Sequence, residues 1–252
     1  MWQDIVDLSE FYTSSLGHTA QRIIRRRIRG WWSDVRGDSV LGVGYATPYL
    51  RPFRDEAARV LALMPGRMGV MAWPREGPNC AAICDEAHLP LPDLSIDRIL
   101  VVHGLECSDQ VRAYLREIWR VLADGGRLIV AVPNRRGIWA RMDHTPFGHG
   151  QPYSIDQLHH ALNNSLFVPQ RSTRLLFVPP SRRRFLMAAA PAWENVGTRW
   201  FQPLAGVVLM EATKQMYAGT TVTAGARRIR AVASVPSGMQ NRSNTAVRRR
   251  AA

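Results

Sequence analysis

At 252 residues, 46% of them hydrophobic, the chain is long enough to bury a full core in one domain of ordinary size. No apolar run approaches the roughly 18–20 residues that a membrane helix needs, and the longest, "RILVVHGLEC" and "RLIVAVP", have the length of strands. The start, "MWQDIVDLSE", carries acids and lacks the basic residues of a secretory signal. We therefore expect a cytoplasmic protein that does not enter membranes.

The formal net charge of +13 would suit a nucleic-acid partner, but the distribution of this charge disfavours one. No acid follows Glu211, while Lys214 and seven arginines lie beyond it and supply +8 of the net charge. Residues 220–252 contain few large apolar side chains, so we expect a basic, disordered tail there. Such a solvated tail is favoured over a specific nucleic-acid site.

The three cysteines are too few and too irregularly spaced for a disulfide framework or a metal site. Cys80 and Cys84 lie in the apolar run "NCAAICD", where small buried thiols are common. We expect all three, including Cys107, to pack in the core and no metal to be bound.

The first expected element is a helical segment over residues 5–36. Isoleucines and tryptophans between residues 23 and 32 recur near the 3.6-residue spacing of a helix, and arginines lie between them. One interpretation is a helix that binds phosphate groups. The other, which we favour, is an amphipathic helix that packs on a sheet and turns its arginines to water.

Short apolar strands then alternate with helices or turns. Strands are expected at residues 38–44, 59–65, 80–86, 96–104 and 127–134, with helices at 47–57 and at 108–123, the latter capped by Ser108. The turn-rich stretch 66–79 predicts no helix. This alternation favours a parallel sheet covered on both faces, with ligands at the carboxyl ends of its strands.

Beyond residue 150 the sequence predicts a helix at 154–167, a strand at 173–180, a broken helix at 182–200 and a last strand at 206–218. The expected organisation has three parts. A helical segment, residues 1–36, caps the ligand site. Residues 37–219 form the α/β domain, and residues 220–252 form the tail.

Three phrases in this order resemble a known family: "VLGVGYATPYL", "DEAHLPLPDLSIDRILVVHGLE" and "LREIWRVLADGGRLIVAVPN". They are similar to class I S-adenosylmethionine-dependent methyltransferases of the type 11 sort. The resemblance covers about residues 10–217. It implies a Rossmann-like, seven-stranded, mostly parallel sheet with helices on both faces, and S-adenosylmethionine as the cofactor.

The resemblance also implies roles for individual residues. Gly44 would let the backbone approach the methionine part of the cofactor. Asp85, with Glu86 beside it, would lie by the adenine. His103 and Gly104 would line the sulfonium side. The remaining cofactor-binding positions that the resemblance implies are Tyr12, which would close over the carboxylate end, and Gly42, Tyr45, Ala46 and Met64.

Several of these positions depart from the family's pattern. The family usually has an acid where Gly42 stands and glycines where Ala46 and Pro48 stand. Met64 occupies the position of the acid that holds both ribose hydroxyls. Losing such a charged hydrogen bond costs about 1.5–3 kcal/mol, or one to two decades of affinity. Glu76 could reach in from the following loop to replace it.

The loop after the fifth strand, "NRRGIWARMDHTPFGHGQPYS", lies where the family contacts its methyl acceptor. His144 and His149 are the candidate bases there, and Arg135, Arg136 and Arg141 could hold an acidic substrate. The alternative is a lid loop with surface histidines. The phrase "HGLEC" after the fourth strand is similar to members that act on small molecules or lipids.

The leading hypothesis is therefore a methyltransferase that acts on an unidentified acceptor. A second is a non-enzymatic relative whose altered pocket serves as a binding or regulatory subunit, and a third is an RNA methyltransferase guided by the tail. The members that the sequence resembles are bacterial. The resemblance also suggests, weakly, a glyoxalase II-type thioesterase as a protein partner.

Overall fold

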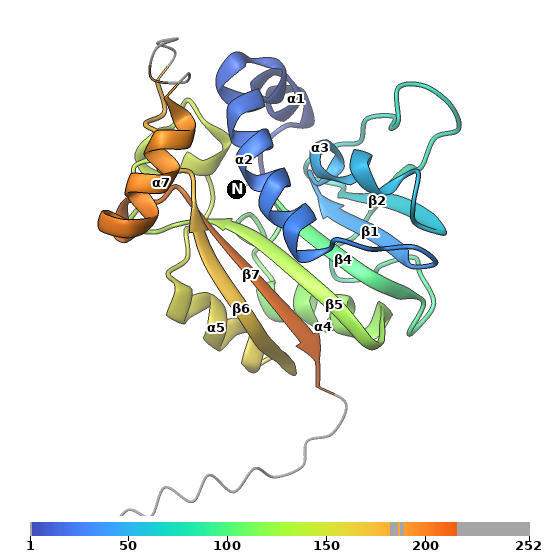
Figure 1. Ribbon diagram of the computed structural model, residues 1–252. Helices are drawn as coiled ribbons and strands as arrows, with labels where there is room; N and C mark the ends of the chain where they lie inside the picture. The colour runs from blue at the N-terminus through green and yellow to red at the C-terminus, as the bar shows by residue number, and fades with distance from the viewer. Residues whose placement is uncertain (1, 182–185, 187–188, 216–252) are drawn as a thin grey trace, which may run out of the picture. The chain divides into compact units, whose positions relative to one another are not determined.

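Seven strands form a single sheet in the computed structural model, which describes residues 2–181, 186 and 189–215 (Figure 1). The strand order is β3-β2-β1-β4-β5-β7-β6. The strands are β1 (Ser39–Gly44), β2 (Arg59–Pro65), β3 (Ala81–Cys84), β4 (Ile96–Val102), β5 (Leu122–Pro133), β6 (Phe167–Leu175) and β7 (Val207–Lys214). This confirms the predicted seven-stranded, Rossmann-like sheet.

The first five strands run parallel, and β7 joins β5 in the antiparallel direction. The register pairs Gly44 at the end of β1 with Val102 at the end of β4. The chain reverses its order across the sheet between β1 and β4, which is where open α/β sheets place their ligands. The sheet thus brings the predicted site residues to one edge.

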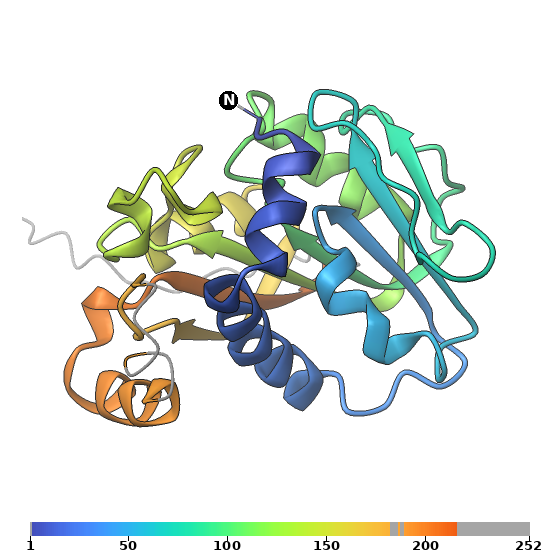
Figure 2. The same cartoon turned by 90° about the horizontal axis from the view of Figure 1, so that it is seen from above.

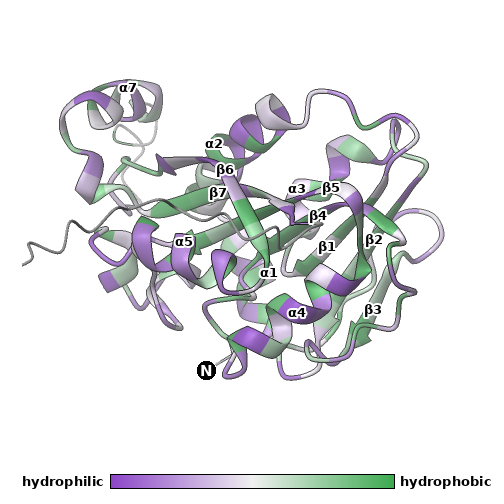
Figure 3. Ribbon diagram, turned by 90° about the horizontal axis from the view of Figure 1, so that it is seen from below, coloured by the Kyte–Doolittle hydropathy of each residue, from purple (hydrophilic) through white to green (hydrophobic). Residues whose placement is uncertain are grey.

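Helices cover both faces of the sheet, as Figures 1 and 2 show. On one face lie α1 (Ile5–Thr13), α2 (Ser15–Trp31), α3 (Thr47–Leu50) with the following 3-10 turn Arg51–Phe53, and α7 (Ala190–Trp200). On the other lie α4 (Val111–Val121) and α5 (Ile155–Asn163). The strands are coloured mainly hydrophobic and the outer helices mix both kinds of residue (Figure 3), as expected for a sheet buried on both sides.

Some predicted boundaries were wrong. The helix expected over 47–57 ends at Leu50 and continues only as a 3-10 turn, because Pro52 cannot donate a backbone hydrogen bond. The strand expected at 173–180 is β6, which starts at Phe167. Ser108 lies two residues before the N-cap of α4, Gln110, and accepts from its backbone N–H instead.

The described residues belong to one compact unit, residues 1–217. None of the helices in the described ranges is both long and apolar enough to cross a membrane. The expected tail, and residues 182–185, 187 and 188 of the expected broken helix, lie outside the described residues.

A buried carboxylate ties the end of α2 to the sheet. Glu211 of β7 is 2% exposed and accepts a hydrogen bond of 2.9 Å from the indole of Trp32 and one of 2.7 Å from the guanidinium of Arg171. Arg127 adds an ion pair at 3.8 Å. Because a buried charge is stable only when it is paired, these contacts fix where α2 crosses the sheet.

We predict that Glu211→Ala lowers the free energy of unfolding by about 3 kcal/mol, because the indole and two guanidinium groups lose their acceptor. Urea denaturation followed by circular dichroism measures the loss. Glu211→Gln keeps an acceptor for Trp32 and is expected to lose less. A loss below about 1 kcal/mol for the alanine variant would contradict this role of Glu211.

Candidate functional site

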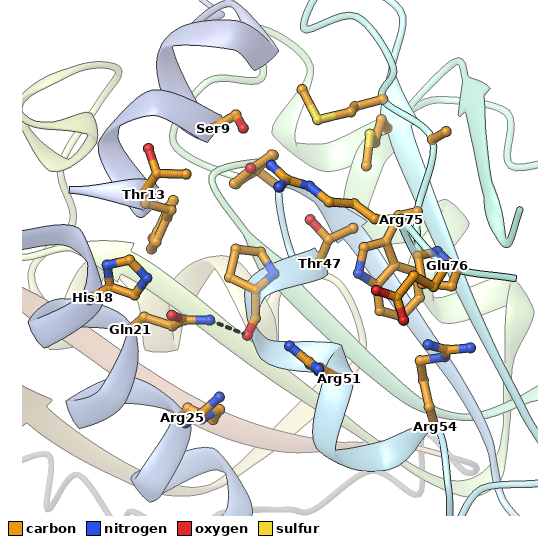
Figure 4. Close-up of a pocket in the computed structure, with 18 of the residues that line it drawn as sticks. Ser9, Thr13, His18, Gln21, Arg25, Thr47, Arg51, Arg54, Arg75 and Glu76 are labelled. Atoms are coloured by element: carbon orange, nitrogen blue, oxygen red, sulfur yellow. Dashed lines mark hydrogen bonds between the residues drawn. The ribbon is translucent and has the colours of Figure 1, made fainter. Parts of the chain in front are cut away.

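A cavity of about 520 Å³ opens at the carboxyl ends of β1 and β2 (Figure 4). Helices α1 and α2 form one wall; α3, its 3-10 turn and the loop between β2 and β3 form the other. The lining residues are Ser9, Tyr12, Thr13, His18, Gln21, Arg22, Arg25, Tyr45, Thr47, Pro48, Arg51, Arg54, Met64, Met71, Ala72, Trp73, Pro74, Arg75 and Glu76. Its volume suits a small organic ligand.

Three of the ten predicted cofactor residues, Tyr12, Tyr45 and Met64, line this cavity, and so does Glu76. The other seven lie elsewhere around the strand ends: Gly42, Gly44, Ala46, Asp85, Glu86, His103 and Gly104. The structure therefore divides most of the predicted set between the cavity and the buried layer beneath it, and leaves Asp85 and Glu86 outside both, in the turn after β3.

Tyr12 connects the two parts. Its hydroxyl lies 2.7 Å from the hydroxyl of Tyr49 and 2.8 Å from Nε2 of His103, and its ring stacks on Tyr45 with centroids 5.6 Å apart. Burial, and then the neighbouring Tyr49, raises the pKa of Tyr12 well above its ordinary value, so this phenol stays neutral. These contacts fix α1 over the ends of β1 and β4.

Beneath Tyr12 lies a buried histidine–carboxylate pair that the sequence analysis only half identified. Nδ1 of His103 lies 3.4 Å from Oε1 of Glu106, and both side chains are 1% exposed. Within the described part of the chain, this nitrogen and both carboxylate oxygens have no hydrogen-bond partner. Glu106 was missed, although an acid within the apolar phrase "HGLEC", three residues after the histidine, is a usable signal.

The two glycines of the first strand are required by close packing. Gly44 has φ +83°, and a Cβ on it would lie 2.3 Å from the carbonyl oxygen of Val102. A Cβ on Gly42 would lie 2.6 Å from Cδ1 of Leu50 and 2.7 Å from Cβ of Ala46. Helix α3 therefore packs directly on β1 and leaves no room for an acid at Gly42.

Asp85 lies in a turn after β3. Its carboxylate accepts a hydrogen bond of 2.9 Å from the backbone of Ala87 and faces His88 at 3.5 Å, and its side chain is 63% exposed. Glu86 is half-buried beside it. These contacts match the structural interpretation of Asp85, in which the carboxylate holds backbone N–H groups at the strand end.

The two candidate bases lie in the loop after β5 and do not line the cavity. His144 is exposed, while Nε2 of His149 lies 2.7 Å from the carbonyl oxygen of Asp143. Arg135, Arg136 and Arg141 are exposed in the same loop. Phe147 of this loop contacts His103, with ring centroids 4.9 Å apart, so the loop closes the histidine from the other side.

The charge of the cavity is strongly positive. Five of its lining residues are arginines, here called the arginine rim: Arg22, Arg25, Arg51, Arg54 and Arg75. Among the described residues that line the cavity, Glu76 is the only acid. These arginines come from three separate segments of the chain, so their grouping could not be predicted from the sequence.

Comparison with known proteins finds the same fold in methyltransferases. A family model described as "Methyltransferase domain" matches residues 39–130, from the start of β1 into β5. Among solved structures, an S-adenosylmethionine-dependent methyltransferase from Mesorhizobium loti has a TM-score of 0.55 at 14% identity, over 80% of this chain and 99% of that one. At this identity the likeness concerns the fold alone.

Two curated proteins are also similar. Over 131 residues the chain is 28% identical to demethylmenaquinone methyltransferase of Corynebacterium efficiens, covering 52% of this chain and 57% of the relative. Over 115 residues it is 35% identical to malonyl-[acyl-carrier protein] O-methyltransferase of Serratia marcescens, covering 43% and 44%. The chain thus spans about half the length of the curated relatives it matches.

We predict that restoring an acid at Gly42 unfolds rather than repairs the site. Gly42→Asp should cost more than about 3 kcal/mol of stability, because it overpacks Leu50 and buries an unpaired carboxylate. Adding Leu50→Ala should recover at least about 1 kcal/mol relative to the sum of the single changes, as measured by a double-mutant cycle in urea. Strict additivity would show that Leu50 is not what occupies the space.

We also predict that Tyr12→Phe lowers stability by about 1–3 kcal/mol at pH 8, since Tyr49 and His103 lose a buried partner. The folded-state pKa of Tyr12 is raised, so its contribution is fully present below the phenol's ordinary pKa and is lost as pH rises beyond it. Unfolding free energies between pH 8 and 11 should therefore fall less in the variant. Equal slopes would contradict the burial of this phenol.

Proposed function

Because the chain belongs to the class I S-adenosylmethionine-dependent methyltransferase family, we propose that it transfers a methyl group from S-adenosylmethionine to a small-molecule acceptor. The observation that carries this proposal is the cavity at the carboxyl ends of β1 and β2, next to the reversal of strand order. Tyr12, Tyr45 and Met64, which the family resemblance implied, line it.

The side chains around the cavity fit this cofactor by their chemistry. Glu76 and Thr47 can accept from ribose hydroxyls, and Trp73 and Met71 offer apolar surface to adenine. The stacked faces of Tyr12 and Tyr45 suit a sulfonium cation, as aromatic faces attract positive charge. An arginine of the rim can hold the carboxylate. When bound, the cofactor would supply an electrophilic methyl group.

Glu76 takes the part of the missing carboxylate in this proposal. Met64, at the family's position for the ribose-binding acid, is 1% exposed and apolar, whereas Glu76 belongs to the loop that closes the same cavity. The remaining predicted carboxylates, Asp85 and Glu86, would not touch a ligand in the cavity. The carboxylate that holds the cofactor would therefore come from the loop between β2 and β3 and not from a strand end.

The acceptor side of the proposal rests on the relatives and on the loop after β5. The two curated relatives are named for demethylmenaquinone and for a malonyl group on a carrier protein, which supports a small or carrier-bound acceptor. We keep His144 and His149 as proposed bases. The exposed ring of His144 makes no hydrogen bond or ion pair within the described part of the chain.

Calorimetric titration with S-adenosylmethionine and S-adenosylhomocysteine tests the proposal. We expect binding in the micromolar range, weakened about tenfold in Glu76→Gln because one charged hydrogen bond is lost. Glu86→Gln removes the same charge outside the cavity and should bind like the wild type. Absence of binding up to millimolar concentration, in protein shown to be folded, would overturn the proposal.

A second candidate is a binding or regulatory protein that keeps the fold without methyl transfer. The specific observation in its favour is the buried layer: the hydroxyl of Tyr12 bonds to both Tyr49 and His103 where the family approaches the cofactor's methionine part. The binding or regulatory role is favoured if neither S-adenosylmethionine nor S-adenosylhomocysteine binds the folded protein.

A further inference from the structure

We propose that the arginine rim binds a phosphate-bearing organic anion with at least two negative charges. This proposal goes beyond methyl transfer, because it assigns a second ligand class to the cavity that the proposed function gives to S-adenosylmethionine, and the binding of that second ligand is measured without a methyl donor. It takes up the interpretation of α2 as a phosphate-binding helix, and extends it to arginines from α3 and the β2–β3 loop.

The charges of the side chains that line the cavity do not balance. Five guanidinium groups face one carboxylate in the described lining of the cavity. S-adenosylmethionine carries two cationic groups and one carboxylate, so it leaves this positive charge uncompensated. A diphosphate or a phosphate ester would compensate it, and guanidinium groups bind phosphate oxygens in a bidentate manner.

Three side chains of the rim lack internal partners. In the described part of the chain, the guanidinium groups of Arg22, Arg25 and Arg51 make no hydrogen bond or ion pair. Arg29, one turn beyond Arg25 on α2, pairs with Glu56, whereas no described acid forms an ion pair with an arginine of the rim. Hydrogen-bond donors that the fold leaves unpaired in a concave site are free to bind a ligand.

Four arginines of the rim form two pairs, one on each wall of the cavity. Arg22 and Arg25 are three residues apart on α2, and Arg51 and Arg54 are three residues apart at the 3-10 turn, so each pair shares one side of its element. Like charges on one side of a helical element repel one another. Figure 4 shows Arg25 on one wall and Arg51 and Arg54 on the other. A polyanion between the walls would relieve the repulsion.

A hydrogen bond joins the two walls of the cavity. The side-chain amide of Gln21, on the same helix as Arg22 and Arg25, donates a hydrogen bond of 2.7 Å to the carbonyl oxygen of Pro48. This bond, dashed in Figure 4, joins α2 to α3 at the cavity and fixes the separation of the two arginine pairs. A preorganised cluster loses less conformational entropy on binding.

The organic part of the ligand follows from the rest of the lining. Met71, Trp73 and Pro74 give the cavity an apolar side, and the guanidinium of Arg54 lies over the Trp73 ring at 5.8 Å. A cavity of about 520 Å³ accommodates a phosphorylated small molecule and is too small to hold a nucleic-acid duplex. The ligand class is therefore a small organic phosphate.

The test is calorimetric titration of the full chain with inorganic pyrophosphate at 50 and 200 mM salt. We expect binding that weakens with salt and falls at least tenfold in Arg25→Gln/Arg51→Gln, which removes one arginine from each wall. Arg112→Gln/Arg116→Gln removes the same charge from the exposed side of α4 and should stay within twofold of the wild type.

Equal losses in both double variants would overturn the proposal, because binding would then follow net charge alone. No pyrophosphate binding to folded protein would also overturn it, and so would a single-stranded RNA oligonucleotide that binds far more tightly and loses as much affinity in the control variant. Titrating S-adenosylmethionine into the same samples separates the two proposals. Cofactor binding without pyrophosphate binding refutes only the rim, and the reverse result refutes only the methyl-donor site.

Discussion

The hydrogen bonds of one buried phenol hold the candidate site together. A hydroxyl that leaves water must find partners inside the protein, and Tyr12 finds two, Tyr49 from α3 and His103 from the end of β4. Because Tyr12 lies at the end of α1, these bonds press that helix onto the strand ends. The outer side of the same helix then forms a wall of the cavity, with Ser9 and Thr13 lining it.

The sheet could be predicted from the sequence because parallel strands buried on both faces read as uninterrupted apolar runs. The phrase "RVLALMP" became β2 with its predicted bounds, and the helix expected from Ser154 is α5, which Ser154 and Gln157 close with a capping box. The short α3 escaped prediction. Its apolar residues read as a longer helix, whereas Pro52 and the packing of Leu50 on Gly42 end it early.

The candidate site was less predictable, since its members are distant in sequence and meet only through tertiary packing. The family resemblance implied Tyr12, Tyr45 and Met64, which line the cavity, although only Tyr45 lies within one of the three resembling phrases. It could not identify the rim, because an arginine on an amphipathic helix has the same pattern whether it faces bulk water or a cavity. Arg22 is exposed and Arg25 half-buried, yet both line the same cavity, and only the position of α3 makes them part of it.

The altered strand-end motif and the charged cavity have a common physical origin. Leu50 and Ala46 fill the space above Gly42, so no carboxylate can stand there, and α3 lies close against β1. That close packing also sets the 3-10 turn beside α2, with Gln21 bonded to Pro48 across the gap. Arg51 and Arg54 then face the arginines of α2. The packing that leaves no room for the family's acid is thus the packing that concentrates positive charge, and an anion is the ligand that such a cavity stabilises most.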